Sequence, residues 1–115
     1  MHIRIQNITN FLHVLGGAII VTAPHNKTKI EGDKAEFLCE AKGMPSNITI
    51  TWYRGNDRID EIEVLESRRK IRTDGTLEIH PLTSDDSGKY RCEVTNGIGG
   101  IQLATAYLNV ECKPN

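Results

Sequence analysis

The stretch Asp86-Ser87-Gly88-Lys89-Tyr90-Arg91-Cys92 decides the fold of this chain. Its last residue, Cys92, lies 53 residues after Cys39, and the chain's one tryptophan, Trp52, lies 13 residues after Cys39. This arrangement is typical of a disulfide that joins two packed β-sheets, with an indole ring against the bridge. Because such a bridge persists only in oxidising surroundings, the same residues predict a protein of the secretory route.

Composition restricts the class of protein. A chain of 115 residues is long enough for one domain with a real core. The formal net charge is −1, so no global field favours nucleic acid or a membrane surface. Aromatic residues make up 5% of the chain, too few for a base-stacking surface. We therefore expect no nucleic-acid partner.

Residues 11–23 are largely apolar and allow two interpretations. They end in Val-x-Ala before Pro24, which resembles a signal peptide with a small-residue cleavage site. The favoured interpretation is two strand ends joined at Gly16-Gly17, because the preceding residues carry three isoleucines and a glycosylation sequon, unlike a charged leader. The segment is too short to span a bilayer, so we expect a membrane anchor to lie outside this chain.

Strand patterns of period two recur along the chain and are separated by turn residues. We expect strands at residues 35–41, 48–53, 77–79, 89–95 and 102–110, and edge strands at 62–65 and 69–73. Asp74-Gly75 is a hairpin signal. The inward positions predict a core of Phe37, Ile50, Trp52, Leu77, Ile79, Leu82, Val94, Leu108 and Val110. The predicted fold is all-β, an antiparallel β-sandwich.

Residues 19–111 resemble an immunoglobulin-superfamily domain of the I-set. The resemblance implies an inter-sheet disulfide between Cys39 and Cys92, with Trp52 packed on it. It makes Tyr90 the tyrosine corner, whose hydroxyl bonds back to the loop before its strand. It also implies a salt bridge from Asp86 to an arginine near the start of a preceding strand, here Arg69 or Arg72.

The resemblance also divides the chain. Residues 1–18 are expected to be the end of a preceding domain or part of a signal peptide, and residues 112–115 the start of a linker. Cys112 is not part of the family pattern; it fits a free thiol, a bridge to another domain or chain, or a linker substitution. Residues 22–28, 31–33, 74–77 and 104–110 look like a middle domain of the turtle/borderless type of neural adhesion receptor. Hemicentin, contactin and receptor-phosphatase domains use similar strings.

Three Asn-x-Thr sequons begin at Asn7, Asn26 and Asn47. Each has the spacing for N-glycosylation, and unmodified surface asparagines are the competing interpretation. Asn47 is expected in a loop before a strand and Asn26 beside the first strand of the domain. Glycans at these sites are expected to leave the opposite sheet face free.

That opposite face is where we expect recognition. The strands 48–53, 89–95 and 102–110 correspond to the family's C, F and G strands. Tyrosine and arginine are enriched at interfaces, although an ordinary solvated face is the competing interpretation. A narrower hypothesis pairs Arg91 with Glu93 across a two-fold axis. The outward residues that form this C–F–G face are Thr51, Tyr53, Arg91, Glu93, Thr105 and Tyr107.

Catalytic and metal patterns are weak. The four histidines have no metal-ligand spacing, and residues 84–87 are better explained as a turn. Asp85-Asp86 has too few oxygen ligands around it for calcium. The basic residues 68–72 suit a polyanion such as heparan sulfate, or an edge strand whose charges oppose pairing. We expect no enzyme activity, no cofactor and no small-molecule substrate.

The favoured function is an extracellular recognition module of a cell-adhesion receptor. It is expected to bind another immunoglobulin-superfamily protein, or a second copy of itself, through the C–F–G face. One alternative is the ligand-binding domain of a receptor kinase or phosphatase. Another is an intracellular structural I-set spacer, which the sequons and the cysteine pair disfavour.

Overall fold

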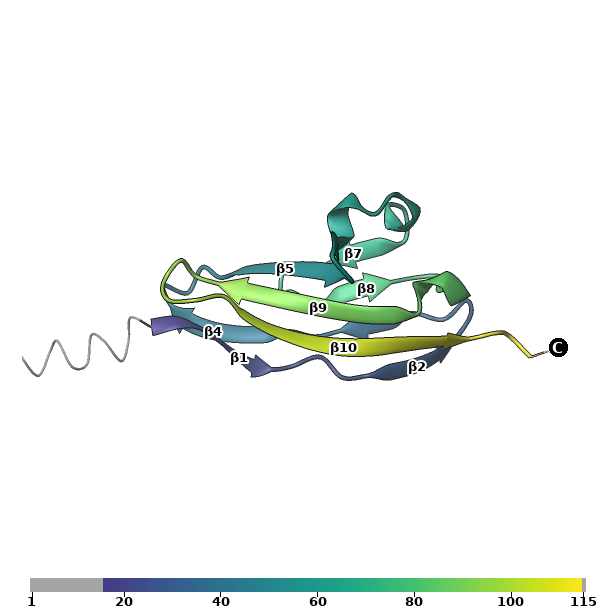
Figure 1. The fold of residues 1–115 in the computed structure, drawn as a ribbon, viewed down its shortest axis with the longest axis horizontal. Coiled ribbons are helices and arrows are strands. Elements are labelled where there is room, and N and C mark those ends of the chain that lie inside the picture. The colour runs from purple at the N-terminus through teal and green to yellow at the C-terminus, as the bar shows by residue number, and fades with distance from the viewer. Residues whose placement is uncertain (1–15, 115) are drawn as a thin grey trace, which may run out of the picture.

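The computed structural model describes residues 16–114, in which the chain forms strands and short 3₁₀ helices (Figure 1). The strands are β1 Gly16–Thr22, β2 Lys27–Ile30, β3 Ala35–Phe37, β4 Glu40–Met44, β5 Thr49–Arg54, β6 Asp57–Arg58, β7 Arg69–Ile71, β8 Leu77–Ile79, β9 Gly88–Thr95 and β10 Gln102–Glu111. The 3₁₀ helices are η1 Ile59–Glu61, η2 Glu63–Leu65 and η3 Ser84–Asp86.

Two layers of strands form a sandwich, which confirms the predicted fold class. One layer has the order β2-β10-β9-β5-β6, in which β2 runs parallel to β10 and the other pairs are antiparallel. The other layer contains β3-β8-β7 and the pair β1-β4. β5, β9 and β10 are the strands expected from the sequence to correspond to the family's C, F and G strands.

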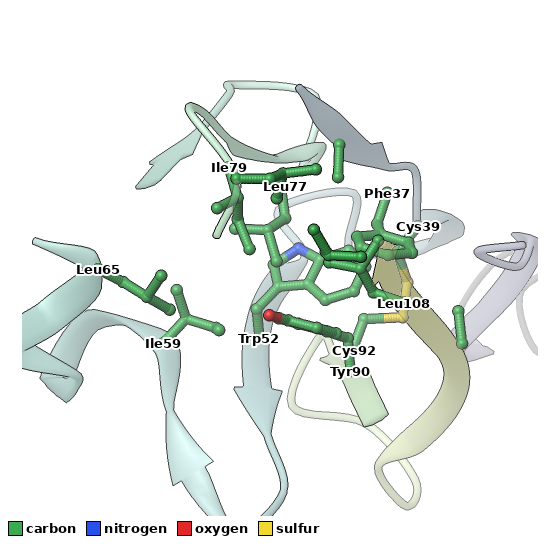
Figure 2. Close-up of a cluster of buried hydrophobic side chains, with 14 of the residues drawn as sticks. Phe37, Cys39, Trp52, Ile59, Leu65, Leu77, Ile79, Tyr90, Cys92 and Leu108 are labelled. Atoms are coloured by element: carbon green, nitrogen blue, oxygen red, sulfur yellow. A yellow bond between two sulfur atoms is a disulfide. The ribbon is translucent and has the colours of Figure 1, made fainter. Parts of the chain in front are cut away.

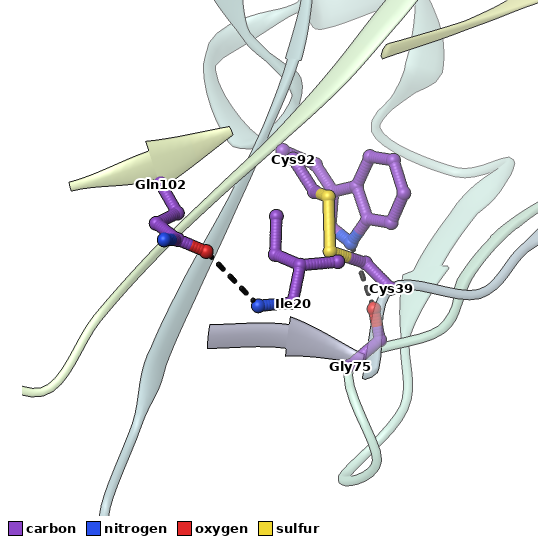
Figure 3. The surroundings of a disulfide bond; sticks show 6 residues. Ile20, Cys39, Gly75, Cys92 and Gln102 are labelled. Atoms are coloured by element: carbon purple, nitrogen blue, oxygen red, sulfur yellow. Dashed lines mark hydrogen bonds between the residues drawn. A yellow bond between two sulfur atoms is a disulfide. The ribbon is translucent and has the colours of Figure 1, made fainter. Parts of the chain in front are cut away.

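The Cys39–Cys92 disulfide connects the two layers, as predicted (Figure 3). Trp52 packs beside it with 1% of its surface exposed, and its indole Nε1 donates a hydrogen bond to Gly75 O at 2.7 Å. This bond satisfies the one polar atom of the ring, which would otherwise be buried without a partner. Gly75 has φ +92°, and an added Cβ would lie 2.5 Å from the Ile50 side chain, so the turn requires glycine.

Aromatic rings and aliphatic side chains fill the space around the bridge (Figure 2). Phe37 stacks on Tyr90 with ring centroids 5.3 Å apart and lies 6.3 Å from Trp52. Ile50 is half-buried at the margin of the core. The other residues of the predicted core are buried: Leu77, Ile79, Leu82, Val94, Leu108 and Val110.

The edge strand predicted at residues 62–65 is wrong. The chain there forms the turns η1 and η2, which bury Ile59 and Leu65 against the sandwich. Ile59, Ile62 and Leu65 are three residues apart, which is the repeat that brings side chains to one side of a 3₁₀ turn. The acidic residues between them stay in solvent.

The predicted turn at Gly16-Gly17 is also wrong, because both residues belong to β1, which pairs with β4. Gly17 is needed for a close contact instead: an added Cβ would lie 2.6 Å from Ile98 O in the loop between β9 and β10. Ala18 is buried in the core. Residues 11–15, the rest of the apolar segment, lie outside the described residues.

Asp86 is a buried residue whose carboxylate accepts three hydrogen bonds and whose backbone carbonyl accepts a fourth. Arg68 binds it in a bidentate manner, with Nη1–Oδ2 at 2.7 Å and Nη2–Oδ1 at 3.0 Å. The Thr83 amide donates to Oδ2 at 2.8 Å, and the Tyr90 hydroxyl donates to Asp86 O at 2.6 Å, which is the tyrosine-corner contact. Burial raises the pKa of Tyr90 to about 12, so the hydroxyl keeps its proton at neutral pH.

The partner of Asp86 is therefore Arg68, and the expected pairing with Arg69 or Arg72 is wrong. Arg68 stands just before β7, where its guanidinium reaches the loop that precedes β9 and also donates to Pro81 O. Arg69 donates to Asp60 O, and Arg72 binds carboxylates of its own sheet.

Removing the Arg68 guanidinium tests this assignment. Arg68→Met leaves the Asp86 charge buried without its partner, and we expect the free energy of unfolding to fall by about 3–5 kcal/mol. The matched variant Arg69→Met should change it by less than about 1 kcal/mol. Urea denaturation measures both; equal effects would contradict the assignment.

A network of charges covers the outer side of β3, β8 and β7. The Glu78 carboxylate forms ion pairs with Arg72 Nε at 2.8 Å and with Lys34 Nζ at 3.2 Å. Arg72 also forms an ion pair with Glu36. The hydrogen bond from Arg72 and, to a smaller extent, that from Lys34 lower the pKa of the Glu78 carboxyl from 4.5 to about 2. Arg68 and Arg72 are thus both paired with carboxylates, whereas Arg69 and Lys70 form no ion pair among the described residues.

The low pKa of Glu78 predicts a dependence of stability on acid. The stabilisation that Glu78 gives the folded chain is complete above about pH 4.5 and is lost as the pH falls through about 2. It is lost because the carboxylate bound to Arg72 and Lys34 then takes up a proton. Glu78→Gln should therefore flatten the curve of urea midpoint against pH between 2 and 4.5. An unchanged curve would show that Glu78 is not held by its cations.

Candidate functional site

The six residues predicted to form the C–F–G face lie together on three neighbouring strands. In the register of the sheet, Thr51 lies opposite Glu93, and Arg91 lies between Tyr53 and Thr105. Tyr107 lies further along β10, opposite Lys89. Their neighbours along each strand point inward, which leaves these side chains on the outer side: the buried alternates are Trp52, Tyr90, Cys92, Val94, Ala106 and Leu108.

Arg91 organises the centre of this face. Its guanidinium carbon lies 4.3 Å from the centroid of the Tyr53 ring, which is a cation–π contact. Arg91 Nε lies 2.9 Å from Glu93 Oε2 at an angle that gives an ion pair but no hydrogen bond. The Arg91–Glu93 pair is thus formed within one chain, which argues against the narrower hypothesis of pairing across a two-fold axis.

Exposed apolar residues extend the face along β10. Leu103 and Tyr107, on the outer side of this strand, are 57% and 55% exposed, and Ile101, just before it, is 61% exposed. Single exposed apolar residues are ordinary, but a row on one strand beside an arginine and a tyrosine is typical of an interaction surface. The sequence prediction omitted Leu103, although its alternation with inward Ala104 was visible.

Asn26 lies beside the C–F–G face, so its expected place on the opposite sheet is wrong. After the buried Pro24 the chain crosses to the layer of β10, so that β2 extends this sheet in parallel. Asn26 precedes β2, and its Oδ1 accepts a hydrogen bond from the Tyr107 amide at 2.8 Å. Asn47 is exposed in the loop before β5, and Asn7 lies outside the described residues.

Other candidate sites have structural explanations. Residues 84–86 form η3, where Thr83 and Asp86 cap each other, so the turn interpretation accounts for this segment. Within residues 16–114, no group of three His, Cys, Asp or Glu side chains could hold a metal ion. None of the helices in this part of the chain is long and apolar enough to cross a membrane. Cys112 is exposed after β10.

A hollow of about 390 Å³ opens between the end of β1 and the outer side of β3 and β7. Its lining includes Pro24, Leu38, Arg72 and Asp74. Arg72 is already bound to Glu36 and Glu78. The lining holds two cationic side chains, Lys27 and Arg72, and two carboxylates, Glu36 and Asp74, so the hollow has no excess of either charge for a ligand.

A family model described as immunoglobulin domain matches residues 19–96. The chain belongs to the immunoglobulin-domain family. Among its relatives, protein turtle of Drosophila melanogaster is 55% identical over 98 residues, which are 85% of this chain and 6% of turtle. Protein borderless of the same fly is 36% identical and covers 96% of this chain and 15% of borderless. Protein turtle homolog B of Homo sapiens is 38% identical, covering 90% of this chain and 8% of that protein. The chain thus spans a small part of these relatives.

Solved structures show the same fold for this immunoglobulin domain. The extracellular domains 3–5 of Drosophila OTK match with a TM-score of 0.74 and 25% identity, covering 83% of this chain and 32% of that chain. A structure described as tandem Ig repeats of Dlar matches with a TM-score of 0.75 and 24% identity, covering 86% of this chain and 48% of that chain. The complex of titin M10 with obscurin-like 1 matches with a TM-score of 0.75 and 23% identity, covering 87% of this chain and 98% of that chain. The last two likenesses concern the fold alone.

Arg91 should contribute modestly to stability. Arg91→Ala removes both the cation–π contact and the ion pair, and we expect the free energy of unfolding to fall by about 0.5–1 kcal/mol. Lys89→Ala, an exposed neighbour on β9, is the matched control and should change it by less than about 0.5 kcal/mol. Equal effects in urea denaturation would show that the stacked geometry adds no stability.

Proposed function

We propose that the chain is an extracellular recognition module of a cell-adhesion protein, and that its C–F–G face binds another immunoglobulin domain. A second copy of this chain is the first partner to test. The observation that carries the proposal is the exposed row Leu103 and Tyr107 beside Arg91, which already stacks on Tyr53. These side chains contribute little to the core and combine apolar, aromatic and cationic contact groups on one surface.

The shape of the domain supports a place in a row of domains. β1 begins at one end of the sandwich and β10 finishes at the other (Figure 1). Residues 19–111 would then be the recognition unit, and residues 1–18 and 112–115 would lead to neighbours. An elongated module of this kind leaves its sheet faces accessible from the side. The likeness to turtle and borderless supports the cell-adhesion setting.

Self-association tests the face directly. Sedimentation of the 115-residue chain should show a concentration-dependent dimer that Tyr53→Ala with Tyr107→Ala weakens by at least about tenfold, because both rings leave the contact. The matched variant, Val21→Ala with Ile71→Ala, removes two exposed apolar side chains from the other layer and should leave the association unchanged. A chain that stays monomeric at high micromolar concentration would contradict binding between copies.

The compartment has its own test. We expect mass spectrometry of protein from an animal secretory host to find the Cys39–Cys92 bridge and glycans on Asn-x-Thr sites, Asn26 and Asn47 included. Bare asparagines together with a reduced cysteine pair would favour the intracellular spacer instead.

A further inference from the structure

The side-chain amide of Asn26 uses its oxygen in a hydrogen bond, whereas its nitrogen is not hydrogen-bonded to any described residue. Its Oδ1 accepts the Tyr107 amide hydrogen at 2.8 Å and so takes the place of a backbone acceptor beside β10. This bond fixes which end of the amide is oxygen, because only oxygen can accept from an N–H group. Nδ2, the atom that carries an N-linked glycan, has no hydrogen-bond partner among the described residues, and Asn26 is exposed.

Thr28, the third residue of the sequon, is also accessible. It is exposed in β2, where it lies opposite Asn109, whereas Lys27, the middle residue of the sequon, is half-buried. Asn26 directly precedes Lys27, the first residue of β2, and so lies just outside the strand. A glycan can therefore be attached without breaking a bond of the sheet.

The register sets the distance from this site to the C–F–G face. Lys27 lies opposite Leu108 in the parallel pair, which places Asn26 beside Tyr107. Neighbouring strands are about 4.8 Å apart, so the Asn26 side chain lies within one strand's width of the backbone of Tyr107, a residue that is 55% exposed. Tyr53 lies on β5, beyond β9, two strands further across the sheet.

We propose that a glycan on Asn26 covers Tyr107 and closes the β10 side of the C–F–G face, while Tyr53 and Arg91 stay accessible. N-linked glycans are bulky and strongly hydrated, and the Tyr107 bond holds the attachment point in place. The consequence for partner binding rests on the proposed function: association that needs Tyr107 is weaker in the glycosylated chain. Occupancy of one sequon would thus regulate the recognition face.

The test compares accessibility of the two tyrosines in chains from an animal secretory host. Nitration with tetranitromethane, followed by peptide mass spectrometry, reports each ring separately. We expect Tyr107 to react several-fold more slowly in the glycosylated chain than in Thr28→Ala, which loses the sequon but keeps the Asn26 bond. Tyr53 should react equally in both. Asn47→Gln, which removes the other described sequon, should leave the Tyr107 rate as it is in the parent chain.

Enzymatic removal of the glycan gives a second measurement on a fold that has already formed. Peptide-N-glycosidase turns Asn26 into aspartate, whose Oδ1 still accepts from the Tyr107 amide, so the sugar is lost and a carboxylate is gained while the hydrogen bond is kept. Tyr107 should then nitrate at the rate of Asn26→Asp, which carries the same carboxylate and no sugar. An unoccupied Asn26 by intact mass, or equal Tyr107 rates with and without the glycan, would overturn the proposal.

Sedimentation of the same samples separates this proposal from the proposed function. Tighter association of Thr28→Ala than of the glycosylated chain, by about tenfold, supports both. Shielding of Tyr107 in a chain that is monomeric in every form supports the covering of the ring and contradicts binding between copies. Association that is equal in all forms despite shielding overturns the regulatory consequence.

Discussion

The Cys39–Cys92 bridge and the Trp52 ring packed beside it are the contacts on which the two layers depend. The bridge closes a loop of 53 residues, which stabilises the fold by about 2–4 kcal/mol through the unfolded chain. The indole fills the space next to it and ties the hairpin turn at Gly75 to the core through its one N–H group. Both sheets thus bury their inner faces around one cluster, and their outer faces remain for other uses.

The Arg68–Asp86 pair extends this organisation to one end of the sandwich. A buried carboxylate is costly unless it is paired and hydrogen-bonded, and Asp86 receives a guanidinium and a backbone amide. Its backbone carbonyl accepts the Tyr90 hydroxyl. Because Tyr90 lies in β9 two residues before Cys92, the turn, the strand and the bridge are held in one register. That register puts Arg91 and Glu93 outward, on the face proposed for recognition.

The crossing of the chain at Pro24 brings the sequon at Asn26 to that face. β1 pairs with β4 in one layer and β2 pairs with β10 in the other, so the short segment between them brings Asn26 to Tyr107. The same residue then has two roles: its oxygen completes the edge of the sheet, and its nitrogen is available for a sugar. The proposed recognition face and the proposed glycosylation site thus meet at one edge, although Asn26 and Tyr107 are 81 positions apart.

The sequence by itself determined the sandwich, the bridge, most of the core and the outward positions of the C–F–G face. These follow from period-two alternation and from a spacing of cysteines and tryptophan that few folds share. Only the tertiary structure decided that Arg68 rather than Arg69 or Arg72 reaches Asp86, that residues 59–65 coil to bury Ile59 and Leu65, and that Asn26 joins the sheet of Tyr107. The physical reason is that alternation says which side of a strand a residue occupies, whereas the partner of a long side chain, the path of an irregular segment and the choice of sheet for an edge strand depend on contacts between distant parts of the chain.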